Sequence, residues 1–179
     1  SKYDIDAGES NAIFKGEPVV VDLSTSTGGY IVTAAAGTTM VGVLNGVLFT
    51  DATTNKPTFS NFYPAATTPA NSEDITAFVN DDPFQEYIIG TDATLGGTLA
   101  LRKSKIGLTY ATTAAAGSTT TGESSIQLGI STAATTAKQL RMVRIAEDPE
   151  NEDQTAANCK VVVKVNLHQY TVGSLATGI

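Results

Sequence analysis

Short stretches in which apolar and polar residues alternate follow one another along most of the chain. The most regular stretch lies near the C-terminus. One set of its positions holds Val161, Val163, Val165 and Leu167, and the other holds Lys160, Val162, Lys164, Asn166 and His168. A period of two places each set on its own face of a β-strand. Residues 159–167 are therefore predicted to form a strand with one mostly apolar face and one mostly polar face.

Further stretches of this kind are separated by Gly, Pro, Asn and Asp, which favour turns. They span residues 12–15, 18–22, 30–33, 40–50, 58–63, 74–79, 86–90, 98–102, 106–110 and 140–145. Helical periodicity is weak throughout. The pattern indicates an all-β fold, either a β-barrel or a Greek-key or jelly-roll-like sandwich, with long Thr/Ala/Gly-rich loops.

Short turns between some of these strands predict hairpins. The strands 12–15 and 18–22 meet at Lys15-Gly16-Glu17, and 74–79 and 86–90 flank a turn rich in Asn and Asp that contains Pro83. The strands 98–102 and 106–110 are expected to pair across the three residues between them.

The most apolar stretch, residues 40–50, is interrupted by Gly42 and Gly46. Glycine inside a strand is typical of a bulge or a sharp bend, so a long bent strand is predicted here. The next stretch supplies Phe59, Phe62 and Tyr63, and half of the aromatic side chains in this region are expected in the core.

A chain of 179 residues is long enough for one domain with a continuous core. We expect an N-terminal arm over residues 1–10, a single β domain over 11–170 and a C-terminal tail over 171–179. Residues 111–138 form a Thr/Ala/Gly/Ser tract, expected as exposed loops around one strand, with a small sub-lobe as a possible arrangement.

The chain is acidic, with a net charge of −7, and only 16% of its residues are charged. Nucleic-acid binding depends on neutralising phosphates with Lys and Arg, so direct binding to DNA or RNA is not expected. An anionic membrane is disfavoured for the same reason, and no apolar run is long enough to span a bilayer. The N-terminal residues lack the apolar run of a secretory signal, so synthesis in the cytoplasm is expected.

Residues that could carry chemistry are few. The one histidine, His168, lies on the mostly polar face of the last predicted strand, where a solvated or hydrogen-bonded role is favoured over catalysis. The one cysteine, Cys159, is expected as a buried thiol rather than a reactive one. The acidic segment 147–153 lacks the spacing of a calcium loop and is expected to be solvated. We expect no catalytic residue, metal or cofactor.

Three stretches together resemble capsid decoration proteins, also called cement or head structural proteins, of tailed bacteriophages. The first is YDIDAGESNAIFKGEPVVV, residues 3–21, with Glu17 where the family more often has Asp. The second is AAAGTTMVGVLNGVLFTDATTNKPTFSNFYPA, residues 34–65. The third runs from Ile75 through AFVNDDP and GSTTTGESSIQL to NLHQY, residues 166–170. No single stretch is specific; their order and combination carry the resemblance, which covers most of the chain.

The resemblance implies a non-enzymatic β protein on the outer face of an icosahedral phage head, located in the virion. Its partner would be the major capsid protein, and it would act as a homo-oligomer, with a trimer favoured. We place capsid contact on the N-terminal arm, at Ser1, Lys2, Tyr3, Asp4, Ile5 and Asp6, because this segment precedes the first predicted strand. The alternative for this segment is a frayed terminus.

Two other functions stay open from the residues alone. A receptor-binding or glycan-binding module of a phage tail or fibre would also be all-β and rich in Thr and Gly. A hydrolase would need an activity that depends on His168 or on a pair of carboxylates.

Overall fold

The computed structural model describes residues 1–24, 26, 28–151 and 153–171. The chain divides into two compact units. Unit 1 comprises Ser1–Ala34, Met40–Asp82 and Ala116–Ser125, and unit 2 comprises Ala35–Thr39, Pro83–Ala115 and Ile126–Ile179. The prediction of one domain over residues 11–170 did not anticipate this division, in which the chain passes repeatedly between the units.

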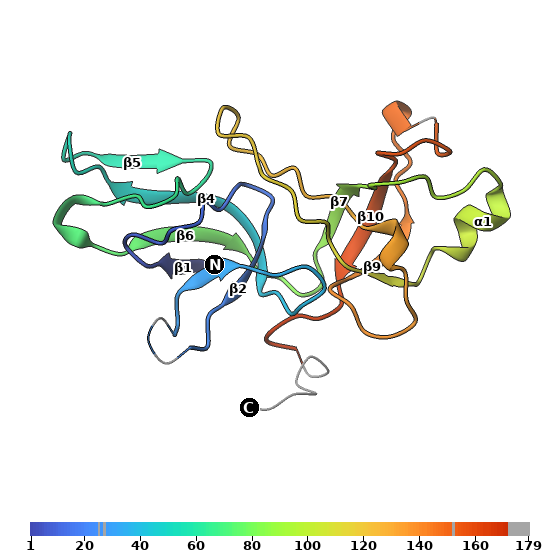
Figure 1. Cartoon of the computed structure of the whole chain (residues 1–179), viewed down its shortest axis with the longest axis horizontal. Helices are drawn as coiled ribbons and strands as arrows, with labels where there is room; N and C mark the ends of the chain where they lie inside the picture. The colour runs from blue at the N-terminus through green and yellow to red at the C-terminus, as the bar shows by residue number, and fades with distance from the viewer. Residues whose placement is uncertain (25, 27, 152, 172–179) are drawn as a thin grey trace. The chain divides into compact units, whose positions relative to one another are not determined.

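Unit 1 contains a six-stranded antiparallel sheet. Its strands are β1 (Lys2–Ile5), β2 (Pro18–Val21), β3 (Ile31–Thr33), β4 (Gly42–Thr50), β5 (Pro57–Ser60) and β6 (Ile75–Asn80). The order is β1-β6-β4-β2-β3, and β5 pairs with the second half of β4 (Figure 1). Both β2 and β5 lie on the same side of β4, since β4 is long enough to pair with each in turn.

β4 confirms the predicted long strand with a bulge. Its register against β6 shifts between Leu44 and Gly46, which leaves Asn45 outside the ladder. The inward-facing side chains of this sheet form a core whose most buried members include Leu44, Val47 and Ile75. Tyr63, one of the aromatic residues of the predicted strand 58–63, is fully buried in the same core.

Glu17 closes the turn that precedes β2. Its side chain is buried, and Oε2 accepts a hydrogen bond of 2.8 Å from the Phe14 backbone N–H. Burial raises the pKa of this carboxyl above its ordinary value of 4.5, against the opposing effect of hydrogen bonds from Phe14 and Thr33. Glu17 is therefore harder to ionise in the folded protein than in the unfolded chain.

Glu17→Gln is expected to make folding less sensitive to pH. A raised folded-state pKa contributes stability that is complete below the unfolded pKa and is lost as the pH rises through the folded value. The free energy of unfolding of the native protein should therefore fall, relative to Glu17→Gln, as the pH rises from about 4.5 towards 7. Urea unfolding of both proteins across this range checks it, and parallel pH profiles would contradict it.

Unit 2 contains a four-stranded antiparallel sheet in the order β7-β10-β9-β8. Its strands are β7 (Glu86–Gly90), β8 (Thr109–Tyr110), β9 (Leu140–Ile145) and β10 (Lys160–Val165). The central strand β10 lies within the predicted strand 159–167, but its burial does not alternate, because Val161, Val162 and Val163 are all buried. Val162, expected on the mostly polar face, is opposite Ile88 of β7. Val162 is itself only 2% exposed.

The helices are short. One α-helix, α1 (Leu99–Ser104), and the 3₁₀ helices η1 (Ala70–Ser72), η2 (Ile130–Thr132) and η3 (Pro149–Asn151) occur in the described residues. The predicted strand 98–102 is wrong, because α1 occupies it. Thr98 caps this helix by accepting a hydrogen bond from the Leu101 N–H, and Leu, Ala, Arg and Lys are strong helix formers. No helix in the described part of the chain is long and apolar enough to cross a membrane.

The predicted all-β fold is confirmed, and of its alternatives the closed barrel is not formed by the described strands. All three predicted hairpins are wrong. Residues 98–102 do not pair with 106–110, because α1 occupies the first segment and β8 pairs with β9. β6 and β7, expected to pair, belong to the sheets of different units. Residues 12–15 do not pair with β2; instead Ile13 forms a single bridge with Tyr63 and Lys15 one with Glu123. Turn-forming residues between two segments were therefore not sufficient to pair them, since each segment pairs with residues that are distant in sequence.

The Thr/Ala/Gly/Ser tract is divided between the units. Residues 116–125 belong to unit 1 and the flanking parts to unit 2. The predicted strand around Ile126 and Ile130 forms no ladder; Leu128 makes isolated bridges to Thr91 and Thr112 and is fully buried. The tract therefore contributes the buried side chain of Leu128 as well as exposed loops.

Candidate interaction surface

The segment expected to form an N-terminal arm is a strand. Four of the six candidate capsid-contact residues, Lys2–Ile5, form β1 and pair with β6, and only Ser1 and Asp6 flank it. The expectation that the segment precedes the first strand is therefore wrong. The reason is its own alternation: Ile5 is fully buried and Tyr3 packs against the core, so the segment has apolar side chains with which to dock.

A hydrogen bond fixes β1 to the end of β6. The Tyr3 hydroxyl donates to Asp81 Oδ2 over 2.8 Å. Burial opposes ionisation of Asp81, but hydrogen bonds from the Ser1 ammonium group and from Tyr3 hold the pKa of its carboxyl below the ordinary value. Asp81 therefore accepts both bonds as a carboxylate at neutral pH.

The alternation of β1 leaves Lys2 and Asp4 on the outer face of the sheet, where both are exposed. Lys2 is opposite Phe78 of β6, and its Nζ lies 5.9 Å from the centre of the Phe78 ring. The Phe78 ring in turn lies 6.1 Å from that of Phe59 on β5, at an interplanar angle of 47°. Leu48 of β4 is opposite Phe59.

We call these four residues, Lys2, Leu48, Phe59 and Phe78, the Phe59–Phe78 face. Phe59 is 59% exposed and Leu48 is 38% exposed. Their strands lie side by side in Figure 1 in the order β5, β4, β6, β1. Large apolar side chains gathered at the surface mark interaction sites more often than isolated ones do.

Gly46 allows the two aromatic rings of this face to meet. It lies on β4 between Phe59 and Phe78, and a Cβ atom there would come within 2.6 Å of Phe59 Cζ and 3.0 Å of the Ser60 carbonyl oxygen. Without that atom the Phe59 ring crosses β4 towards Phe78. The sheet therefore holds the exposed Phe59 ring against the half-buried Phe78 ring.

Gly46→Ala is expected to displace the Phe59 ring and to separate the two rings. The ring tip is flexible, so we expect a loss of stability of about 1 kcal/mol only. Loss of the contact between the rings can be measured by NMR, as a change in the aromatic ¹H chemical shifts of Phe78 relative to the native protein. Unchanged shifts would contradict the role given to Gly46.

Other candidate residues lie in unit 2. His168, expected at the surface, is only 3% exposed, and its Nδ1 accepts a hydrogen bond of 3.1 Å from the Tyr170 N–H. The surface location was therefore wrong: His168 lies beyond the end of β10, and its ring meets that of Tyr170 edge-on with the centroids 6.1 Å apart. Cys159 is buried as predicted, and burial raises the pKa of its thiol, which lowers its thiolate content.

The acidic segment 147–153 is tied to the sheet by Asn151. This side chain donates to the carbonyls of Ala146 and Lys160 and accepts from the Lys160 N–H over 2.8 Å. Asp148 pairs with Lys160 at 3.4 Å. Within the described residues, no three His, Cys, Asp or Glu side chains form a group that could hold a metal ion.

The sequence patterns named Phe59 among the aromatic residues of a strand without placing it at the surface, and they did not single out Phe78. Both lie in predicted strands, but which face of each strand is buried depends on register, and the register becomes visible only when β5, β4 and β6 are paired. The one local signal was Gly46, which the sequence pattern assigned to a bulge or bend and not to a contact between these two rings. No family model, curated protein or solved structure matches the chain.

Proposed function

We propose that this protein is a capsid decoration protein that binds the major capsid protein on the outer surface of a phage head and stabilises the expanded shell. It acts without catalysis, as a homo-oligomer. The observation that carries the proposal is the Phe59–Phe78 face, an exposed aromatic and aliphatic surface bordered by the N-terminal strand. The resemblance of three sequence stretches to decoration proteins supports the same function.

A surface of this kind suits binding to a preformed protein lattice. Aromatic side chains supply a large contact area at a small entropic cost and dominate many interfaces. A protein that binds only the expanded shell stabilises it by RT ln(1 + [L]/Kd) for each site. Many modest contacts repeated over a lattice are therefore sufficient, and no bond needs to be made or broken.

Within residues 1–6, we propose that two side chains contact the shell. They are Lys2, opposite Phe78, and Asp4, opposite Thr76, and both being exposed supports this choice. Tyr3 and Ile5 face the core and would act by holding β1 in place. Removing residues 1–9 would therefore disturb the sheet as well as any contact, so point variants are the sharper test.

Phe59→Ser is expected to weaken binding to expanded phage heads by at least about tenfold, since the loss of a central aromatic contact often exceeds 1 kcal/mol. Binding is measured by co-sedimentation of the protein with heads that lack it. Because the ring is 59% exposed, the fold should survive, which circular dichroism and urea unfolding can verify.

Phe84→Ser is the matched control. Phe84 is 79% exposed and lies in unit 2, outside the Phe59–Phe78 face, so this variant should bind heads as the native protein does. Equal binding by Phe59→Ser and the native protein would contradict the proposed surface. Failure of the native protein to bind heads at all would overturn the proposed function.

A receptor-binding or glycan-binding module of a tail or fibre is the alternative, and one observation favours it: exposed aromatic rings are also used to stack on sugars. That function predicts retention of the protein on host cells or on glycans, with the same dependence on Phe59. Binding to cells without binding to heads would select it.

A further inference from the structure

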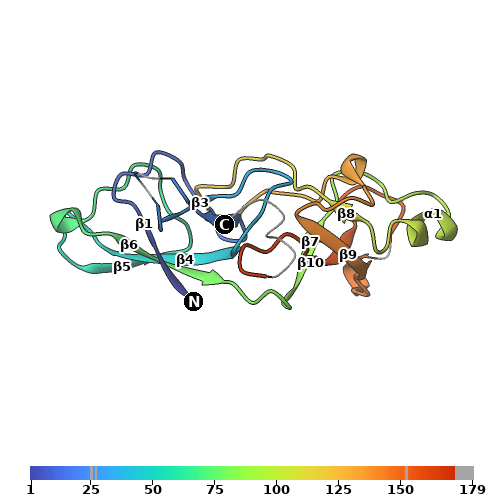
Figure 2. The same cartoon turned by 90° about the horizontal axis from the view of Figure 1, so that it is seen from below.

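A second exposed surface lies in unit 2, on residues 98–107, which we call the α1 segment. The helix has no buried residue, and Leu99 and Leu101 are 55% and 53% exposed. Ile106 adds a third aliphatic side chain at 38% exposure. Figures 1 and 2 show α1 projecting away from the strands of unit 2. Six residues are too few for a helix to be stable through its own hydrogen bonds, so a partner for its apolar side chains is expected.

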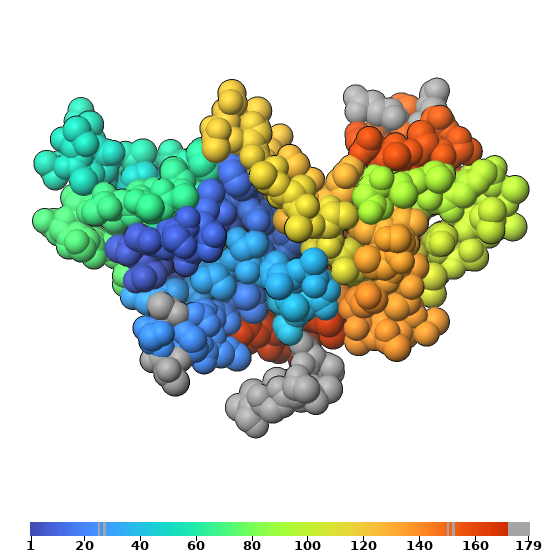
Figure 3. Space-filling view, in the orientation of Figure 1, coloured from blue at the N-terminus to red at the C-terminus, as the bar shows by residue number. Residues whose placement is uncertain are grey.

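The α1 segment is also the most basic part of the chain. It carries Arg102, Lys103 and Lys105, and residues 93–122 contain no acid. The remainder of the chain has 18 acidic residues against eight basic ones. In the described structure neither lysine forms an ion pair. The residues around α1 stand at the surface of unit 2 in the space-filling view (Figure 3). Charge complementarity therefore favours an acidic partner, and this chain is itself acidic elsewhere.

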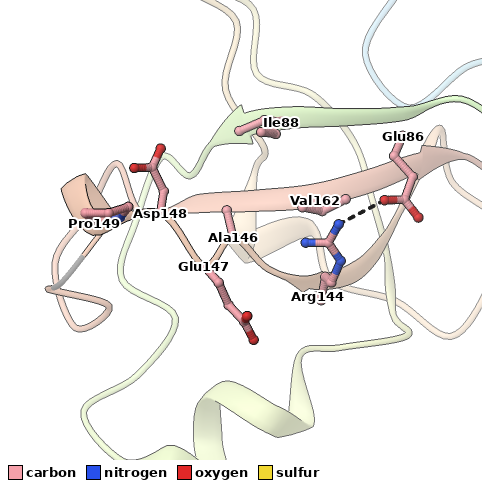
Figure 4. Close-up of a pocket in the computed structure, with 8 residues that line it drawn as sticks. All are labelled: Glu86, Ile88, Arg144, Ala146, Glu147, Asp148, Pro149 and Val162. Carbon is pink, nitrogen blue, oxygen red and sulfur yellow. Dashed lines mark hydrogen bonds and ion pairs between the residues drawn. The ribbon is translucent and has the colours of Figure 1, made fainter.

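A hollow of about 620 Å³ lies over the outer face of the unit 2 sheet. Figure 4 shows the residues that line it: Glu86, Ile88, Arg144, Ala146, Glu147, Asp148, Pro149 and Val162. Its volume is in the range that accommodates several side chains. We call it the sheet hollow.

The sheet hollow has an apolar wall and an acidic end. Ile88 is 66% exposed beside the buried Val162. Glu86 is neutralised by Arg144 at 3.1 Å and Lys164 at 3.6 Å. Glu147, in contrast, is exposed and forms no ion pair with any described residue. It begins the segment 147–153, in which five of seven residues are acidic and none is basic.

We propose that two copies of this chain associate by docking the α1 segment of one copy in the sheet hollow of the other. Leu99 and Leu101 pack on the apolar wall, and Lys103 and Lys105 face the acidic end. Every copy carries both surfaces, so the contact can repeat from copy to copy, and it gives a closed oligomer where the rotation between copies closes. The proposal specifies the contact between subunits of the homo-oligomer in the proposed function. Self-association through this contact does not require binding to phage heads.

The test is sedimentation velocity of the full chain over a range of protein concentrations, at low and high ionic strength. The double variant Lys103→Glu/Lys105→Glu is expected to raise the Kd for self-association at least about tenfold, because attraction at the acidic end becomes repulsion. The control Lys15→Glu/Lys56→Glu changes the net charge equally at two exposed lysines in unit 1 and should leave the Kd unchanged. Leu101→Ser tests the apolar part and should also weaken association.

The reciprocal variant Glu147→Lys/Asp148→Lys should also self-associate more weakly than the native protein. Mixing it with Lys103→Glu/Lys105→Glu should restore association, because each reversed surface then meets its opposite charge. A native protein that stays monomeric at all concentrations, an equal effect of the control, or a mixture that does not associate would each overturn the proposal. If the lysine variant loses binding to heads but keeps self-association, the shell is the partner of α1 and the proposal is also wrong.

Discussion

Gln139→Glu is expected to cost about 3 kcal/mol of stability at pH 7.5, because it places a carboxylate in the interior of unit 2. Gln139 is fully buried. Its Oε1 accepts hydrogen bonds from the Gly37 N–H at 3.3 Å and from the Thr112 hydroxyl at 2.9 Å, while Nε2 has no hydrogen-bond partner. Glutamate keeps the shape and the acceptor, so the change is one of charge alone.

The pH dependence distinguishes this cause from a packing defect. Burial raises the pKa of a carboxyl above its unfolded value, so the variant should approach native stability at low pH and lose it as the pH rises through the folded pKa. Urea unfolding, followed by tyrosine fluorescence between pH 5 and 8, measures the difference. Gln139→Met is the control: it leaves the Gly37 and Thr112 donors unpaired and should show a loss that is independent of pH. A constant difference for Gln139→Glu would contradict the argument.

Gly42→Ala is expected to destabilise unit 1 by about 3 kcal/mol, at the upper end of the cost of overpacking. A Cβ atom at Gly42 would lie 2.2 Å from the Asn80 carbonyl oxygen and 2.8 Å from Val79 Cγ1. The carbonyl belongs to the backbone of β6, so no rotation of a side chain relieves the clash. β4 and β6 must instead move apart where β4 also pairs with β2.

Gly97→Ala provides the matched control for this substitution. A Cβ atom at Gly97 would meet nothing within 4 Å, so the variant should be neutral or slightly stabilised through a less flexible unfolded chain. The melting temperature of Gly42→Ala should fall by about 6 to 12 °C, as expected for a domain of this size. Equal melting temperatures for the two alanine variants would contradict the close approach of β4 and β6.

The residues of the Phe59–Phe78 face are brought together by strand pairing and not by a sequence motif. Lys2, Leu48, Phe59 and Phe78 come from four strands, and only the order β1-β6-β4-β5 gathers them. None of the four is unusual in its local sequence. The same holds for the sheet hollow, whose wall joins β7, β9 and β10.

The sequence alone determined the strand content and much of the strand placement. Alternation of side chains predicted β4 with its bulge, β9 and β10, because a period of two is a local property of the backbone. It also predicted the buried thiol of Cys159. The resemblance to decoration proteins, and the function it implies, likewise came from the sequence and stays a prediction.

Only the tertiary structure decided which strands pair and which side chains remain exposed. The turn at Pro83 does not pair β7 with β6. β7 instead pairs with β10, about 70 residues later. Residues 99–104 form a helix capped by Thr98 where a strand was predicted, and the N-terminal segment is a strand because it pairs with β6. Partners distant in sequence set the register, and the register decides which face of each strand is buried.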